Sequence, residues 1–488
     1  MEYILKDLEP QKCFHYFEDI SRIPRSSYEE QAIAQYVMDF AAQRHLKAYE
    51  DAAHNVYVSK PATPGFENRK PVIMQAHMDM VCVSDPGVVH DFSKDPIELV
   101  IDGDWITAKG TTLGADNGSG VALMLALLDS DDVPHPAIQC IFTTAEEVGL
   151  VGAAQLEPDK FEADYLINLD GGNISRLLTT SAGGSVHIYT VDEEQSPICA
   201  DGQRALKLDV GGLTSGHSGG VVHKGFANAI KLVGEMLASL AEVVDYRLCS
   251  FTGGMKMNAI AKEATATIVC AEADAEKAVA HLTHAGECIK KEFTRTDPDM
   301  TVSVSDAAVP ATAMSPAAQQ KLVALIDLLF DGVYMFYNDE KSMAKTSCNI
   351  GILESVDGKT VGTCLMRSNS NYEHEELIRR AKRISSLLGV QHEIRDRSSA
   401  WEGDGTPLIE KVAALYEQEF GEKPTFTQTH GGVEIGTILG LGATVGRTMY
   451  AVNFGVTAEG AHTTRERMSI TGMKQGFEWL KHVLANLD

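Results

Sequence analysis

Short apolar runs and polar loops alternate through the first 183 residues of the chain. Residues 72–76, 137–144 and 164–170 are apolar runs of strand length, and residues 121–130 form a longer apolar run typical of a buried helix. Alternation of buried strands with helices predicts a mostly parallel sheet that is covered by helices.

A different pattern begins at residue 184. Residues 206–307 alternate between strand-like and helix-like segments, and residues 317–396 repeat the order helix, strand, strand, helix, strand. The repeat lies in the pattern and not in residue identity, and it predicts an inserted domain, residues 184–393, made of two similar halves. We expect an α+β domain, because two strand-like segments follow each other in each half, as in antiparallel pairs.

The first pattern returns in residues 394–488, which contain helix-like segments at 406–420 and 473–487. These residues are expected to complete the domain begun by residues 1–183. The predicted fold is therefore α/β, with a discontinuous catalytic domain around a mostly parallel, helix-covered mixed sheet and an inserted α+β domain. A length of 488 residues agrees with two or three domains.

Charge and cysteine usage narrow the function classes. Acidic residues outnumber Lys and Arg by 68 to 42, and the formal net charge of -26 disfavours binding to nucleic acid or to an anionic membrane surface. The nine cysteines form no C-x-x-C pair, which argues against a disulfide framework. No signal peptide and no apolar run of roughly 18 residues is found, so we expect a cytoplasmic protein.

Candidate metal ligands come directly after the strand-like runs. A His-Met-Asp triplet follows the first run, a Glu-Glu pair follows the second and an Asp ends the third, while LGADNG and GAHTTRE add an Asp and a His. Because ligands bind beyond the carboxyl ends of parallel strands, we expect one shared site. Its seven residues are His77, Asp79, Asp116, Glu146, Glu147, Asp170 and His462.

This set of side chains suits a pair of divalent ions, which need a shared carboxylate with imidazole or carboxylate groups on either side. Asp116 could be the shared ligand, with His77 and Asp170 on one side and Glu147 and His462 on the other. A simple helix N-cap is the alternative for Asp116.

Two acidic residues are left for other tasks. Asp79, two residues from His77, could accept the second imidazole N–H and so fix the tautomer of that ring. Glu146 lies beside a ligand and is not needed as one, which suits a general base that takes a proton from water. A solvated surface pair is the alternative for Glu146 and Glu147.

The motifs HMD, LGADNG and AEE, the strand that ends at Asp170 and the late His462 resemble the co-catalytic dizinc peptidases of the carboxypeptidase G2 type. Within that clan the chain is most similar to the bacterial aminoacyl-histidine dipeptidases, a carnosinase-like group that cleaves Xaa-His dipeptides. The likeness covers nearly the whole chain, including the FEDISRIPR opening and the large insertion.

The resemblance implies two zinc ions, with cobalt or manganese as alternatives, and hydrolysis of a dipeptide by a metal-activated water. It implies Asp79 as the supporting acid, Glu146 as the base and a cis peptide between Asp116 and Asn117. The implied ligands are His77, Asp116 and Asp170 for one ion, and Asp116, Glu147 and His462 for the other.

The resemblance also implies that the insertion acts as a lid over the substrate. His217 would stabilise the oxyanion, and Asn258 and Arg367 would bind the substrate carboxylate, a task that suits a guanidinium. His430 and Glu434 lie in a Gly-rich segment expected near the substrate, with Glu434 a candidate partner for its amino group. A structural role for His430 and an ion pair for Arg367 are the alternatives.

Substrate and assembly stay open at this point. GGN follows Asp170 and GAHTTRE surrounds His462, where the aminoacyl-histidine dipeptidases have an acidic run and a Pro-rich loop. We expect a dipeptide substrate with a free amino terminus, of the Xaa-His type. A deacylase or aminoacylase on the same scaffold, and a non-catalytic metal-binding protein, are the alternatives. A homodimer and a monomer both agree with the doubled insertion.

Overall fold

The computed structural model describes residues 3–487 and divides into two compact units. The first unit is Met1–Ser181 together with Trp401–Asp488, and the second is Ala182–Ala400. Within the described residues, every helix is too short or too polar to cross a membrane.

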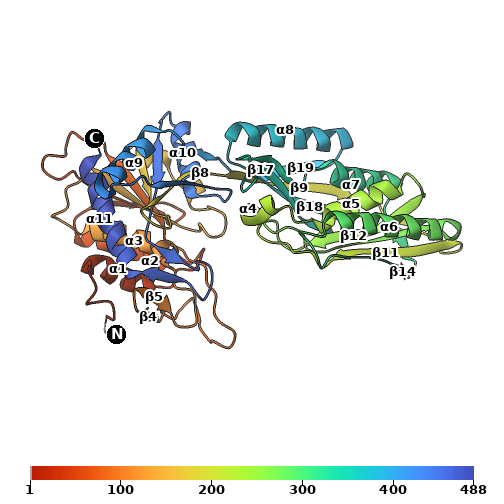
Figure 1. Ribbon diagram of the computed structural model, residues 1–488, viewed down its shortest axis with the longest axis horizontal. Coiled ribbons are helices and arrows are strands. Elements are labelled where there is room, and N and C mark those ends of the chain that lie inside the picture. The colour runs from red at the N-terminus through yellow and green to blue at the C-terminus, as the bar shows by residue number, and fades with distance from the viewer. Residues whose placement is uncertain (1–2, 488) are drawn as a thin grey trace. The chain divides into compact units, whose positions relative to one another are not determined.

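A mixed nine-stranded sheet forms the centre of the first unit (Figure 1). Its order is β1-β2-β6-β3-β7-β22-β8-β20, with β21 paired to β8. Neighbours among β6, β3, β7 and β22 are parallel, whereas β1, β2, β8 and β20 join antiparallel. The strands are β1 (Lys47–Glu50), β2 (Val56–Lys60), β3 (Val72–His77), β6 (Ile138–Thr143), β7 (Tyr165–Asn168), β8 (Arg176–Ser181), β20 (Trp401–Glu402), β21 (Thr425–Thr429) and β22 (Tyr450–Asn453).

A smaller antiparallel sheet in this unit has the order β23-β24-β5-β4. Its strands are β4 (Leu99–Asp102), β5 (Trp105–Ala108), β23 (Ala458–Glu459) and β24 (Arg467–Ser469).

Helices cover the main sheet of the first unit. Helix α3 packs on β3, and α1 and α11 pack against α3. Every residue of β3 and β6 is buried, as expected for parallel strands with both faces covered. The predicted α/β fold with a mixed, helix-covered sheet is confirmed, and parallel pairing is concentrated at its centre. The helices are α1 (Gln11–Ser21), α2 (Gln31–Gln43), α3 (Ala115–Leu128), α9 (Pro407–Phe420), α10 (Glu434–Thr444) and α11 (Ile470–Asn486).

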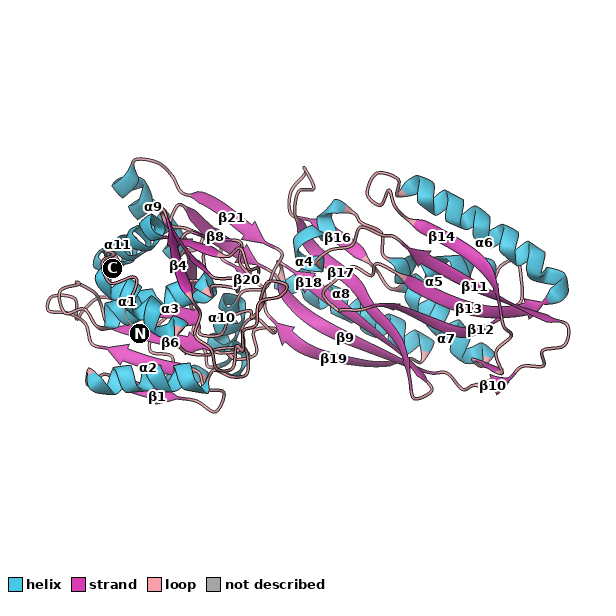
Figure 2. Cartoon of the chain, turned by 90° about the horizontal axis from the view of Figure 1, so that it is seen from below, coloured by secondary structure: helices cyan, strands magenta, loops and turns pink. Residues whose placement is uncertain are grey.

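The second unit contains a nine-stranded antiparallel sheet of order β14-β11-β13-β12-β17-β18-β9-β19, with β16 beside β17 (Figure 2). A two-stranded sheet, β10 and β15, accompanies it. The strands are β9 (Gly183–Asp192), β10 (Ser196–Pro197), β11 (Gln203–Gly211), β12 (Tyr246–Gly254), β13 (Ala264–Ala271), β14 (Thr301–Ala307), β15 (Thr312–Ala313), β16 (Gly332–Phe336), β17 (Ala344–Val356), β18 (Lys359–Ser368) and β19 (Gln391–Ser398).

Four helices lie in a row against one face of this sheet, in the order α6, α5, α7, α8. The repeated order helix, strand, strand, helix, strand is present as α5-β12-β13-α6-β14 and as α7-β17-β18-α8-β19, with β16 added to the second half. One hydrophobic core joins both halves. The helices are α4 (Ser218–Val221), α5 (Ala229–Leu240), α6 (Glu272–Glu292), α7 (Pro316–Leu328) and α8 (Asn371–Leu388).

Candidate metal centre

Three neighbouring parallel strands bring the predicted ligands to one edge of the main sheet. His77 is the last residue of β3, Glu146 and Glu147 follow β6, and Asp170 follows β7. Because β6, β3 and β7 are adjacent and parallel, their carboxyl ends meet at this edge. Asp116 joins them from the start of α3, and His462 joins them from the loop between β23 and β24.

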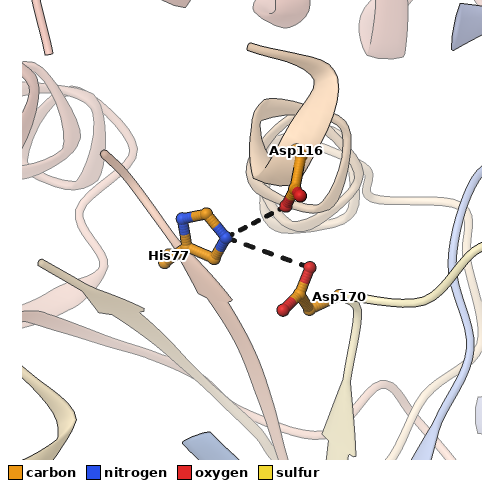
Figure 3. A group of neighbouring side chains, drawn as sticks. All are labelled: His77, Asp116 and Asp170. Atoms are coloured by element: carbon orange, nitrogen blue, oxygen red, sulfur yellow. Dashed lines mark hydrogen bonds and ion pairs between the residues drawn. The ribbon is translucent and has the colours of Figure 1, made fainter. Parts of the chain in front are cut away.

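The first ligand group consists of His77, Asp116 and Asp170 (Figure 3). The Nε2 atom of His77 lies 3.2 Å from Asp116 Oδ1 and 3.9 Å from Asp170 Oδ1. Ligand atoms of all three residues lie within 4.8 Å of one another, a spacing that one metal ion could span.

The second ligand group consists of Asp116, Glu147 and His462. His462 Nε2 lies 2.9 Å from Glu147 Oε2 and 3.4 Å from Asp116 Oδ2. Asp116 therefore faces one group with Oδ1 and the other with Oδ2. The peptide that joins it to Asn117 is cis, as the resemblance implies.

Asp79 contacts the candidate ligands but belongs to none of the groups that could hold a metal ion among the described residues. Its Oδ1 lies 3.4 Å from the Nδ1 atom of His77, on the side of the ring opposite Nε2. Asp79 also accepts hydrogen bonds from the backbone N–H groups of Glu146 (3.0 Å) and Glu147 (3.2 Å). One buried carboxylate thus orients a histidine and fixes the loop that carries both glutamates.

Glu146 stands beside the first group. Its Oε2 atom lies 4.0 Å from His77 Nε2, and burial raises the pKa of its carboxyl to about 8. His77, Glu146 and Glu147 also meet the spacing for a metal ligand group, so distance alone does not separate a base from a ligand at Glu146.

Burial and the close approach of several carboxylates shift the pKa values of this cluster. Burial, with the neighbouring charge of Asp116, raises the pKa of Asp170 well above its ordinary value. Burial opposes ionisation of Asp116 as well, yet hydrogen bonds from His462 and His77 hold its pKa low. Hydrogen bonds to Asp116 and Glu147 raise the pKa of His462 to about 10. Oxygen and imidazole donors with uncompensated negative charge fit divalent cations.

Two buried charged residues that sequence reasoning missed hold the ligand loops. Glu466 accepts hydrogen bonds from the backbone N–H groups of Leu113, Gly114 and Asp116, at 2.8, 2.8 and 3.1 Å. Arg25 donates to the backbone carbonyl of Gly114 at 2.6 Å. Both stand near recognised motifs, in HTTRER and FEDISRIPR, but their partners are backbone atoms, which no residue pattern reveals.

Glu434 lies beneath the same edge of the sheet, at the first position of α10. Its Oε2 atom accepts hydrogen bonds from Gln75 Nε2 and from Thr143 Oγ1, and its Oε1 atom is buried without a partner. Burial raises the pKa of Glu434 to about 8. His430 is also buried, in the segment between β21 and α10.

The remaining predicted residues belong to the second unit. His217 caps α4, where its Nδ1 atom accepts from the N–H groups of Gly219 and Gly220, both at 3.2 Å. The turn that carries Asn258 lies against the same loop, because Asn258 O accepts from Ser218 N at 2.8 Å. His217 and Asn258 are therefore held together although 40 residues separate them in the sequence.

Arg367 occupies β18, on the sheet face that the helices leave uncovered. It pairs with Ser347 of β17, and its neighbour Met366 points into the helix-covered core. The Nε atom is buried without a hydrogen-bond partner, and burial lowers the pKa of the guanidinium. No ion pair joins Arg367 to a carboxylate among residues 3–487, so the alternative of a structural ion pair is not observed.

Comparison with known proteins gives agreement along the whole chain. Over 484 residues it is 32% identical to the cytosol non-specific dipeptidase of Escherichia coli (strain K12), covering 99% of both chains. The crystal structure of aminoacylhistidine dipeptidase from Vibrio alginolyticus matches with a TM-score of 0.87 and 32% identity, over 99% of this chain and 98% of that one. Aminopeptidase PepT from Bacillus cereus, 16% identical with a TM-score of 0.55 over 98% and 99% of the two chains, shares the fold. Residues 73–486 match the profile of a hydrolase family, and the chain belongs to this family, peptidase family M20/M25/M40.

Proposed function

We propose that this protein is a metal-dependent dipeptidase that binds two divalent ions, with zinc as the proposed metal. The observation that carries the proposal is the position of Asp116, whose two carboxylate oxygens face separate ligand groups. Imidazole nitrogens and carboxylate oxygens are ligands that zinc accepts readily. When bound, the ions would polarise the scissile carbonyl and acidify a water.

Glu146 is the base of the proposed reaction. It removes a proton from the water as the oxygen of that water forms a C–O bond to the scissile carbonyl, which leaves an oxyanion. It then passes the proton to the nitrogen, so that the C–N bond breaks, the carbonyl forms again and the amine leaves. A raised pKa suits this task, because a carboxyl with a pKa near the working pH both accepts and releases a proton. Asp79 keeps Glu146 in place by accepting a hydrogen bond from the backbone N–H of Glu146.

The second unit supplies substrate contacts in this proposal, and we assign it the role of a lid. Arg367 and Asn258 bind the C-terminal carboxylate of the substrate, and His217 stabilises the oxyanion. A partly buried guanidinium whose Nε atom has no hydrogen-bond partner among residues 3–487 favours an anionic ligand. Fixed spacing between the carboxylate contacts and the oxyanion contact would restrict cleavage to dipeptides.

Glu434 is the proposed partner of the substrate amino group. Its free Oε1 atom lies on a carboxylate whose ionised form a nearby ammonium would stabilise. The relatives carry the names non-specific dipeptidase and aminoacylhistidine dipeptidase, and we propose Xaa-His dipeptides among a wider range of substrates. We further propose a cytoplasmic enzyme whose catalysis needs no second copy of the chain.

A pair of isosteric variants tests the mechanism. Glu146→Gln should keep both metal ions, measured by elemental analysis, while dipeptide hydrolysis falls by roughly 1,000-fold. Glu147→Gln, the matched control one residue away, should lose metal as well as activity. Near-normal turnover in Glu146→Gln, or loss of metal from it, contradicts the assignment of the base.

A further inference from the structure

One buried side chain from the other half of the second unit forms hydrogen bonds with the turn that carries Asn258. Asn349 lies on β17 and is 3% exposed. Its Nδ2 atom donates to the carbonyl oxygens of Met257 and Ala259, both at 2.9 Å. A single amide group therefore holds the backbone immediately before and immediately after Asn258.

The same turn is joined to the His217 loop by backbone contacts. Asn258 O accepts from Ser218 N at 2.8 Å, and His217 and Ala259 form an isolated antiparallel bridge. Three segments of the second unit are thus locked to one another, namely β17, the Asn258 turn and the His217 loop. Movement of one of them would move the others.

A glycine on β17 allows this strand to approach the turn closely. A Cβ atom at Gly351, two residues after Asn349, would lie 2.5 Å from the carbonyl oxygen of Met257, so this position requires glycine. The two halves of the unit share few other strand contacts here, because β12 pairs with β17 only at Gly253 and Gly254. The Asn349 side chain therefore adds two hydrogen bonds across this seam, beside the single one that Asn228 donates to Ile350.

Asn349 and Arg367 share one face of the sheet. Arg367 pairs with Ser347, and Asn349 lies two residues further along β17. Side chains two residues apart on a strand point to the same side, while Cys348 between them points into the helix-covered core. The Asn258 turn accordingly lies over the face that carries Arg367.

We propose that Asn349 is a positioning residue for the substrate carboxylate, holding Asn258 beside Arg367 and at a fixed spacing from His217. This inference rests on the proposed function, in which Asn258 and Arg367 bind that carboxylate. Asn349 itself touches no substrate. Without its two hydrogen bonds, the carbonyls of Met257 and Ala259 lose their buried donor, and the turn relaxes away from β17. The enzyme then discriminates less strongly in favour of dipeptides, whose C-terminal carboxylate lies on the residue that follows the scissile bond.

The test compares a dipeptide with its C-terminal amide and with a tripeptide. Asn349→Leu keeps the side-chain size and removes the donor. We expect KM for the dipeptide to rise about tenfold with kcat nearly unchanged, and the preference for the dipeptide over its amide and over the tripeptide to fall by a similar factor. Equal losses on all three substrates, or an unchanged preference in the folded variant, would overturn the inference.

Asn228 provides a matched control. It is also 3% exposed, and its Nδ2 atom donates to the carbonyl of Ile350 on β17 at 2.9 Å. The hydrogen bonds of its side chain go to Asp331, Ile350, Ile230 and Lys231, outside the Asn258 turn. Asn228→Leu should lower the melting temperature and leave substrate preference unchanged. If Asn349→Leu fails to fold, Asn349→Ser is measured in the same way. Failure of the wild-type protein to cleave any dipeptide would instead contradict the proposed function.

Discussion

In the first unit the candidate metal ligands contact one another. In the second unit Arg367 has no ion-pair partner within the described part of the chain, and Asn258 is held through its backbone. The first cluster arises because parallel strands end at a common edge. The second group arises because antiparallel register places distant residues on one open face. A cluster with excess negative charge favours bound cations, and a partly buried guanidinium without an ion pair among the described residues favours a bound anion.

The largest effect is expected where the metal cluster depends on one residue. Asp116→Asn should weaken both ion sites and reduce hydrolysis by at least roughly 1,000-fold, because the shared carboxylate faces both groups. Asp170→Asn should weaken only one site. The stoichiometry of bound zinc in the two variants measures the difference, and equal stoichiometries would show that Asp116 is not shared.

In the second unit the corresponding variant is Arg367→Leu. Removal of the guanidinium should raise KM for dipeptides by about 100-fold and leave zinc content unchanged, since loss of a buried charge partner costs about 3 kcal/mol. Dipeptide amides, which lack the carboxylate, should lose much less. A similar loss on both substrate types would mean that Arg367 supports the fold and not the carboxylate.

The same contrast explains what the sequence could predict. His77 and Asp170 follow apolar strand-like runs, so their convergence could be expected from topology alone. Glu466, Arg25 and Asn349 form hydrogen bonds with backbone atoms of segments far away in the chain. Every residue type has these backbone atoms, so the pattern of residue types does not predict such partners. Whether Arg367 has an ion-pair partner likewise depends on the register of β17 against β18, which periodicity does not fix.

Acid should destabilise the second unit through three linked histidines, of which His187 and His374 are buried and His392 is partly buried. Hydrogen bonds link His374 to Ser185, Ser185 to His187, and His187 to His392, each at 2.8 Å. Burial lowers the pKa of His187 to about 3, and of His374 and His392 to about 4, from an ordinary value of 6.5. At pH values between the ordinary pKa and the lowered ones, these histidines bind protons in the unfolded chain but not in the folded chain. The free energy of unfolding therefore falls as pH falls.

From pH 7 to pH 5.5 we expect a loss of about 1 kcal/mol for each histidine, or ~3 kcal/mol in all, measured by urea unfolding. His392→Phe should reduce the pH dependence by about one third. Tyr189 stacks on His392 at a centroid distance of 4.3 Å, so Tyr189→Phe is the control that keeps the ring without changing the slope. A slope that is insensitive to His392→Phe would contradict the assignment of a neutral His392 in the folded protein.

The smallest effect is expected at the support of the metal cluster. Glu466→Gln replaces one of two accepting oxygens with an NH₂ group that faces a backbone N–H of the Leu113–Asp116 loop. Zinc affinity should fall about tenfold, the lower end of the range for residues that orient metal ligands. Glu459→Gln, at an exposed ion pair with Arg467, should not change it. Because Glu466 fixes Asp116 and Asp116 faces both ligand groups, the two zinc affinities should fall together; a loss confined to one ion would show that the loop positions only one side of the cluster.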